Sequence, residues 1–97
     1  MTVVVTRDVP ARFRGFLASV MLEIAPGVYT SPRMDEGVRQ RVWEVLEQWY
    51  YDLGSPGSIV MTWRAPSESG GQAVRTLGIP PKELHDHDGL LLVRRPV

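Results

Sequence analysis

The chain has 97 residues, 43% of them hydrophobic, and its formal net charge at pH 7 is zero. This composition predicts one small globular domain and argues against a disordered protein or one that coats nucleic acid through bulk positive charge. Cysteine is absent, which excludes disulfides and thiolate metal sites. Because the sequence also lacks an apolar run of membrane-spanning length and a basic-then-apolar signal segment, we expect a cytoplasmic protein that does not bind membranes.

The first half of the chain predicts two strands and two helices in alternation. A valine-rich run has the composition of a buried strand, and two later segments carry apolar residues every three or four positions, as amphipathic helices do. Pro10 suits the first position of the first helix, where its missing N–H has no intrahelical partner to lose. The predicted elements are a strand over residues 2–6, a helix over 10–24, a strand over 28–30 and a helix that opens at Ser31-Pro32 and ends at Gly54.

The second half has the composition of strands. Two such segments flank a Ser-Glu-Ser-Gly-Gly loop, which predicts a hairpin, and a largely apolar segment near the end predicts a last strand. These strands are predicted over residues 58–65, 72–78 and 90–95, with a loop before the last one. The order βαβαβββ predicts an α+β fold, in which two helices pack on one face of a mainly antiparallel sheet. We expect residues 1–97 to form a single domain.

The segment 89–97 is the part of this domain that we expect to serve assembly. An apolar strand left as a bare edge invites uncontrolled pairing, so another strand, such as one from a second protomer, should cover it. Arg94 and Arg95 are strand neighbours that face opposite sides, which leaves at least one of them for an acidic partner surface. The candidate partner-binding residues are Leu91, Val93, Arg94 and Arg95.

The sequence lacks the residues that most catalytic mechanisms require. Neither a cysteine nor a G-x-S-x-G serine supports nucleophilic catalysis, and no glycine-rich phosphate loop occurs. The stretch 85–89 contains two histidines and two aspartates, but the later acid that a calcium loop needs is missing. We interpret it as a turn into the last strand with His85 and His87 solvated; the alternative is a small metal site.

The junction between the first strand and the first helix carries three arginines and one acid. Asp8 is a candidate metal ligand and catalytic acid for phosphodiester cleavage, but such sites recruit several carboxylates, so a dimer partner would have to supply a second one. The alternative role of Asp8 is to cap the following helix. Arg12 and Arg14 flank the N-terminus of that helix, whose free N–H groups favour an anion. Because cations there oppose the helix dipole, two of them favour phosphate binding over the alternative of solvated charge.

These segments resemble those of a known family. The opening "VP-x-R-x-RG-x-L" and the later "D-x-DGL" are the most specific pieces, and "VVVT", "GVYTS", "IVMTWRAPSESGG" and "TLGIP" extend the similarity over almost the whole chain. The chain is identified as a member of the CRISPR-associated adaptation proteins (the Cas-two family), which are the small partners of the CRISPR integrase. Within that family it resembles the type I-E branch.

The resemblance implies a ferredoxin-like fold and a homodimer that bridges two integrase dimers. Such a complex captures double-stranded DNA and inserts it into the CRISPR array as a new spacer, and the basic face of the dimer holds the phosphate backbone. No cofactor is required for this structural role. The DNA-binding positions implied here are Arg12, Arg14, Lys82, Arg39 and Arg33.

The wider family is also described as metal-dependent endonucleases that use an acid at the end of the first strand with Mg²⁺. In this chain Arg7 occupies that position, and the acid, Asp8, follows one residue later. Because neighbouring strand residues face opposite sides of a sheet, the shift argues against cleavage. We therefore favour a non-catalytic DNA-binding subunit. The alternatives are a Mg²⁺-dependent endonuclease of RNA or DNA with Asp8 at the dimer interface and, less favoured, a protein-interaction module that binds no nucleic acid.

Overall fold

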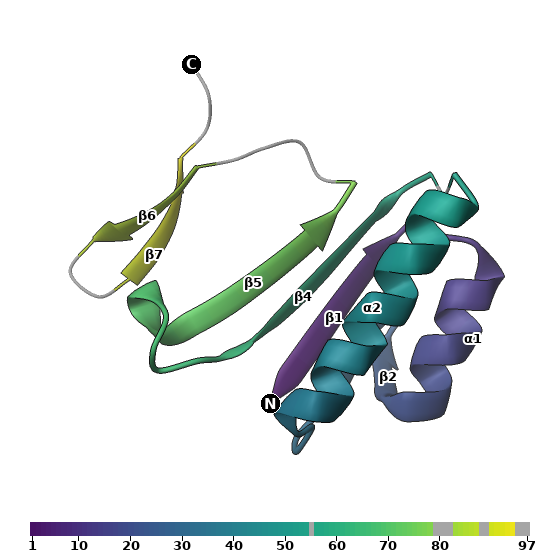
Figure 1. Cartoon of the computed structure of the whole chain (residues 1–97), viewed down its shortest axis with the longest axis horizontal. Coiled ribbons are helices and arrows are strands. Elements are labelled where there is room, and N and C mark those ends of the chain that lie inside the picture. The colour runs from purple at the N-terminus through teal and green to yellow at the C-terminus, as the bar shows by residue number, and fades with distance from the viewer. Residues whose placement is uncertain (55, 79–82, 88–89, 95–97) are drawn as a thin grey trace.

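The structure, a computed structural model, describes residues 1–54, 56–78, 83–87 and 90–94, and it describes side chains only as far as residue 78. Within these residues, a five-stranded antiparallel sheet of order β2-β3-β1-β4-β5 carries two α-helices on one face (Figure 1). The elements are β1 (Thr2–Arg7), α1 (Ala11–Val20), β2 (Leu22–Ala25), β3 (Val28–Ser31), α2 (Glu36–Asp52), β4 (Ser58–Arg64), the 3₁₀ helix η1 (Ser69–Gly71), β5 (Gln72–Leu77), β6 (Glu83–His87) and β7 (Leu90–Arg94). Neither α-helix in this part of the chain is long and apolar enough to cross a membrane.

The first six elements, from β1 to β4, confirm the predicted ferredoxin-like α+β arrangement. The central strand β1 pairs antiparallel with β3 on one side and with β4 on the other, so that Val4 lies opposite both Tyr29 and Met61. Alternate strand residues therefore face the helices, and this face holds the core. The largest fully buried side chains are Tyr29, Phe13, Leu17, Leu46, Ile59, Met61, Val4 and Thr2. Burial of each large apolar side chain stabilises the fold by about 1.5–3 kcal/mol.

The predicted first helix is wrong beyond Val20. Met21 is extended, and its N–H donates to the Leu17 carbonyl oxygen at 2.8 Å, which closes α1. Leu22–Ala25 then forms the edge strand β2, which pairs with β3. The side chain of Ile24, which continued the helical spacing, is 60% exposed. Pairing with a strand that comes later in the chain therefore outweighed the local helical pattern.

The second helix begins later than predicted. The strand β3 runs to Ser31, and α2 starts at Glu36, where the Asp35 carboxylate accepts a hydrogen bond from the Val38 N–H at 2.8 Å. This side-chain cap, rather than Ser31-Pro32, sets the helix start, because it satisfies an N–H group that lacks an intrahelical partner.

The chain after β5 also differs from the prediction. Residues Glu83–His87, predicted as a loop, form β6, which pairs antiparallel with the final strand β7 and lies beside η1. The predicted last strand is confirmed at residues 90–94, and its partner is β6 of the same chain. Both histidines belong to β6 and not to a loop. Lys82, Arg95 and the ends of the proposed 89–97 tail lie outside the described residues.

Candidate nucleic-acid interface

Three chain segments meet where β1 ends. Arg7, the last residue of β1, lies opposite Ser58, and Asp8 leaves the strand in a left-handed conformation with φ +57°. Gly57 has φ +87°, and a Cβ added there would collide with the carbonyl oxygens of Arg7 and Asp8. The carbonyl oxygen of Gly57 accepts a hydrogen bond from the Tyr50 hydroxyl at 3.1 Å. The turn that leads into α1 is thus held against the C-terminal end of α2.

Asp8 is exposed at this turn. It is not a residue of β1, and it does not cap α1. The strand alternation does not reach it, because it lies beyond the end of β1. The predicted capping role is wrong, since the N-cap of α1 is Pro10 and no side chain caps it. Within the described residues, no group of three or more acidic, histidine or cysteine side chains is placed to hold a metal ion.

The guanidinium of Arg12 lies over the indole of Trp49, 4.1 Å from the ring centroid. Two phenylalanines of α1, Phe13 and Phe16, meet the same indole edge-on at 5.8 Å and 5.3 Å. A guanidinium that stacks through its flat face keeps its in-plane N–H donors available for an anion. The aromatic cluster between α1 and α2 therefore orients Arg12 without neutralising it.

Arg14 points to a different part of the surface from Arg12. It lines a cavity of about 360 Å³ together with Thr6, Asp8, Val9, Pro26 and Gly27, whereas Arg12 lies against α2. Two residues along a helix are about 200° apart around its axis, which accounts for the divergence. The two exposed arginines thus lie on either side of the first turn of α1, as the sequence spacing predicted.

Tyr29 lies under this region in the core. Its side chain is fully buried, and its hydroxyl forms no hydrogen bond within the described residues. Burial raises the pKa of the Tyr29 hydroxyl above its ordinary value of 10.0, the Glu23 carboxylate close by raises this pKa further, and Arg14 opposes the shift. The carboxylate of Glu23 itself accepts a hydrogen bond from the Gly27 N–H at 3.1 Å.

Tyr29→Phe should separate the fold's stability at neutral pH from its stability at alkaline pH. A raised folded-state pKa means that the wild-type fold keeps its full stability below pH 10 and loses some of it as the pH rises through the folded pKa. The phenylalanine removes an unbonded hydroxyl, so we expect a change within about 1 kcal/mol at pH 7 and a smaller alkaline loss than in the wild type. Urea unfolding at pH 7 and about pH 11 measures both, with the exposed Tyr51→Phe as control. Equal alkaline losses in wild type and Tyr29→Phe would contradict this account.

Of the other predicted DNA-binding residues, Arg39 does not join Arg12 and Arg14. Arg39 lies near the start of α2, ten residues before Trp49, which places it about 15 Å away along the helix axis. It is half-buried, and its Nη1 donates to the Met34 carbonyl oxygen at 3.2 Å. Arg33 is exposed in the segment before α2. Lys82 lies outside the described residues, and the side chains of Leu91, Val93 and Arg94 in β7 are not described.

Comparison with known families settles the class of the protein. A family model described as CRISPR-associated protein (Cas_Cas2CT1978) matches residues 1–92. The chain belongs to this CRISPR-associated family. The match includes the whole five-stranded sheet, both α-helices and the turn that carries Arg12 and Arg14. It confirms the Cas-two resemblance that the sequence motifs indicated.

Sequence reasoning missed several residues that shape this Cas2-type protein. Nothing in the sequence indicates that Trp49 lies under Arg12, because the position of Trp49 fits the apolar stripe of α2. Gly57 carried no signal beyond membership of a turn, although its contacts fix the path of Arg7 and Asp8. The pairing of Arg39 with Trp63 links residues that are far apart in the sequence, and no local pattern reveals it.

Proposed function

We propose that this Cas2-type protein is a DNA-binding structural subunit of the CRISPR spacer-acquisition complex, of the type I-E branch, in which a homodimer bridges CRISPR integrase dimers. The observation that supports this most is the pair of exposed arginines on the first turn of α1. Arg12 is oriented by Trp49, and neither arginine forms an ion pair within the described residues. Uncompensated guanidiniums beside a helix N-terminus suit the phosphates of a duplex.

The electrostatics of the first turn support phosphate contact and not a structural charge. No acidic residue occupies the first turn of α1. The two guanidiniums oppose the helix dipole there, so in the isolated protein they bring no stability from that interaction. Phosphate contacts of this kind supply affinity that does not depend on the DNA sequence. A subunit that accepts new spacers of any sequence needs such affinity.

The uncovered face of the sheet supports the homodimer. Both α-helices lie on the opposite face, so the second face of the sheet remains without a helix in the described part of the chain (Figure 1). Val5 stands on this face opposite Val28 and Val60, and its side chain is 41% exposed. Val28 and Val60 are half-buried, so the three valines form a partly exposed aliphatic surface. Such a surface favours association with a second copy, which would bring two arginine turns to one duplex.

The alternative, Mg²⁺-dependent cleavage, needs a donor set that the described residues of one chain do not supply. Within the described residues Asp8 has no companion carboxylates arranged around a common point. Two-metal phosphodiester cleavage depends on several such oxygen ligands. The described residues of a single protomer therefore do not fit a Mg²⁺ ion, and a second Asp8 across a dimer axis would add one carboxylate to them.

Asp8→Asn tests the choice between holding and cutting. We expect the variant to bind duplex DNA like the wild type, because Asp8 lies outside the pair of contacting arginines. We also expect neither protein to cleave RNA or DNA above the background with or without Mg²⁺. The matched control is Asp52→Asn, which removes an exposed carboxylate at the end of α2. Cleavage by the wild type that requires Mg²⁺ and is lost in Asp8→Asn but kept in Asp52→Asn would establish the nuclease instead.

A further inference from the structure

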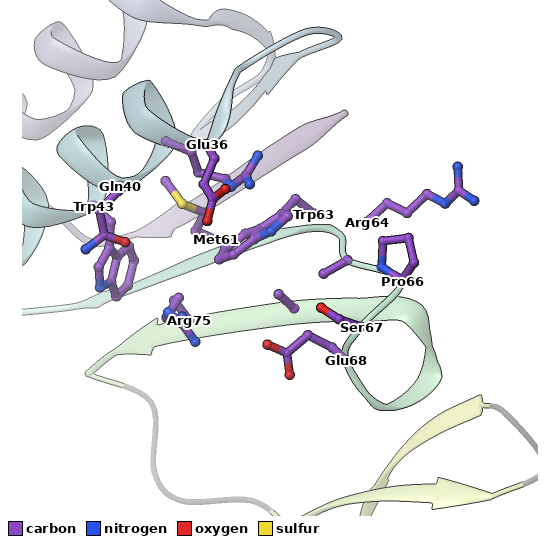
Figure 2. Close-up of a pocket in the computed structure, with 13 residues that line it drawn as sticks. Glu36, Gln40, Trp43, Met61, Trp63, Arg64, Pro66, Ser67, Glu68 and Arg75 are labelled. Carbon is purple, nitrogen blue, oxygen red and sulfur yellow. The ribbon is translucent and has the colours of Figure 1, made fainter.

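A second cleft, of about 320 Å³, lies between the first turns of α2, the strands β4 and β5, and the turn after β4 (Figure 2). It is built around α2's N-terminal end, whereas Arg12 packs against the C-terminal end of the same helix. The residues that matter for its chemistry are Glu36, Arg39, Trp43, Trp63, Glu68 and Arg75.

Trp63 forms the centre of this cleft, with a guanidinium from each of two elements against its indole. Arg39 of α2 lies 4.5 Å from the ring centroid, and Arg75 of β5 lies 5.5 Å from it. The strand register explains the second contact: Trp63 is opposite Ala73 and Met61 is opposite Arg75, so all four residues share the helix-covered face. Arg39 is held further by its hydrogen bond to the Met34 carbonyl oxygen.

The two guanidiniums that lie against Trp63 are not ion-paired within the cleft. Within the described residues, neither Arg39 nor Arg75 forms an ion pair, although Glu36 and Glu68 line the same cleft. Stacking on the indole restricts both side chains and leaves in-plane N–H donors unused, since Arg39 donates only to Met34 and Arg75 to no described acceptor. Two oriented guanidiniums of like charge without an anion are arranged to receive one.

The other walls of the cleft decide which anion fits. Trp43, Met61 and Ala73 are buried and give the cleft an apolar floor. The carboxylates of Glu36 and Glu68 also line the cleft, and their repulsion grows with the charge of the anion. They therefore disfavour a phosphate dianion or the run of charges along a nucleic-acid backbone more than a single carboxylate. A ligand with one carboxylate and an apolar portion fits both the guanidiniums and the floor of the cleft. Its carboxylate pairs with Arg39 and Arg75, and its apolar portion covers the floor.

We propose that the Trp63 cleft binds a carboxylate carried on an apolar peptide segment of a partner protein. This assigns Arg39, which the family resemblance had suggested as a DNA contact, to peptide recognition together with Arg75. The assignment does not depend on duplex binding by Arg12 and Arg14. An experiment can therefore contradict one of these two proposals and leave the other intact.

The probe that tests this proposal is N-acetyl-L-leucine, a carboxylate with an apolar side chain. The indole N–H signal of Trp63 in a ¹H–¹⁵N spectrum, assigned through Trp63→Phe, reports binding. We expect a saturable shift with a dissociation constant of about 1 mM or weaker, as befits a small fragment. N-acetyl-L-leucinamide, which lacks the charge, should give no saturable shift.

Variants of Arg75 make the test specific. Arg75→Gln should weaken the binding of N-acetyl-L-leucine about tenfold, because one charge-assisted contact is lost. Arg75→Lys, which keeps the charge without the planar fork, should fall between Arg75→Gln and the wild type. The matched control is Arg41→Gln, which removes an exposed arginine of α2 that does not line the cleft, and it should leave the affinity unchanged.

Three results would overturn the proposal. The first is a wild-type spectrum without a saturable shift, and the second is equal affinity in Arg75→Gln and the wild type while the rest of the spectrum is preserved. The third is a Trp63 shift that inorganic phosphate or a DNA duplex produces as strongly as the carboxylate does. This last result would assign the cleft to nucleic acid, and it would leave the proposal for Arg12 and Arg14 standing.

Discussion

Replacement of Arg12 and Arg14 by alanine is expected to weaken duplex DNA binding for every sequence and to flatten its dependence on salt. Each phosphate contact contributes about 0.9 to the slope of log affinity against log salt concentration, so the double variant should lose about 1.8 from that slope. At about 0.1 M salt, this corresponds to a loss of roughly 10- to 100-fold in affinity. Fluorescence anisotropy of a labelled duplex across a salt series measures both quantities.

The control for this experiment is Arg41→Ala, which removes an exposed arginine of α2 near the opposite end from Trp49. It should leave the salt slope unchanged. Arg12→Ala also removes the stacking on Trp49, which is worth about 0.5–1 kcal/mol at an exposed site, so thermal unfolding of the double variant should confirm that the fold remains. An unchanged salt slope in a folded double variant would show that the phosphate contacts lie elsewhere.

Gly57→Ala should produce the largest loss of stability of any change considered. The residue has φ +87°, and an added Cβ would meet the carbonyl oxygens of Arg7 and Asp8, which are backbone atoms that cannot rotate away. We expect the free energy of unfolding to fall by more than about 3 kcal/mol, because left-handed strain and a backbone collision act together.

The chain supplies a matched control for this prediction in Gly54. This glycine also has positive φ, +57°, but an added Cβ there would meet nothing within 4 Å. Gly54→Ala should therefore carry the conformational strain alone, about 1–2 kcal/mol. Urea unfolding of the two variants measures the difference. Equal losses would mean that the segment around Gly57 does not hold the start of α1 in place.

The spacing of apolar residues predicted those elements that bury one face of their own against the core. The strands β1, β4 and β5 and most of both α-helices follow this rule. The strand β2 does not, because Met21 and Ile24 continue the spacing of α1 and only pairing with β3 makes the segment extended. The strand β6 escaped prediction for a related reason, since its pairing with β7 outweighs a polar composition.

The candidate interface was predictable in its charges and not in its geometry. Arg12 and Arg14 stood out because two cations at a helix start are unfavourable without an anion. The stacking of Arg12 on Trp49 and the left-handed conformation of Asp8 depend on contacts between segments more than 30 residues apart in the sequence, at Trp49 and Gly57. Sequence similarity grouped Arg39 with the DNA contacts, whereas the structure places it on Trp63, in the cleft between the start of α2 and the strands β4 and β5.

The most direct test of the central claim is the acquisition of new spacers in cells that carry the complete CRISPR system, measured by sequencing the array. The wild type, Asp8→Asn and the double alanine variant of Arg12 and Arg14 are compared at equal protein levels. If the protein holds DNA without cutting it, Asp8→Asn extends the array at the wild-type rate and the double variant does not extend it. Loss of acquisition in Asp8→Asn, with duplex binding preserved and with the double variant still active, would contradict the account.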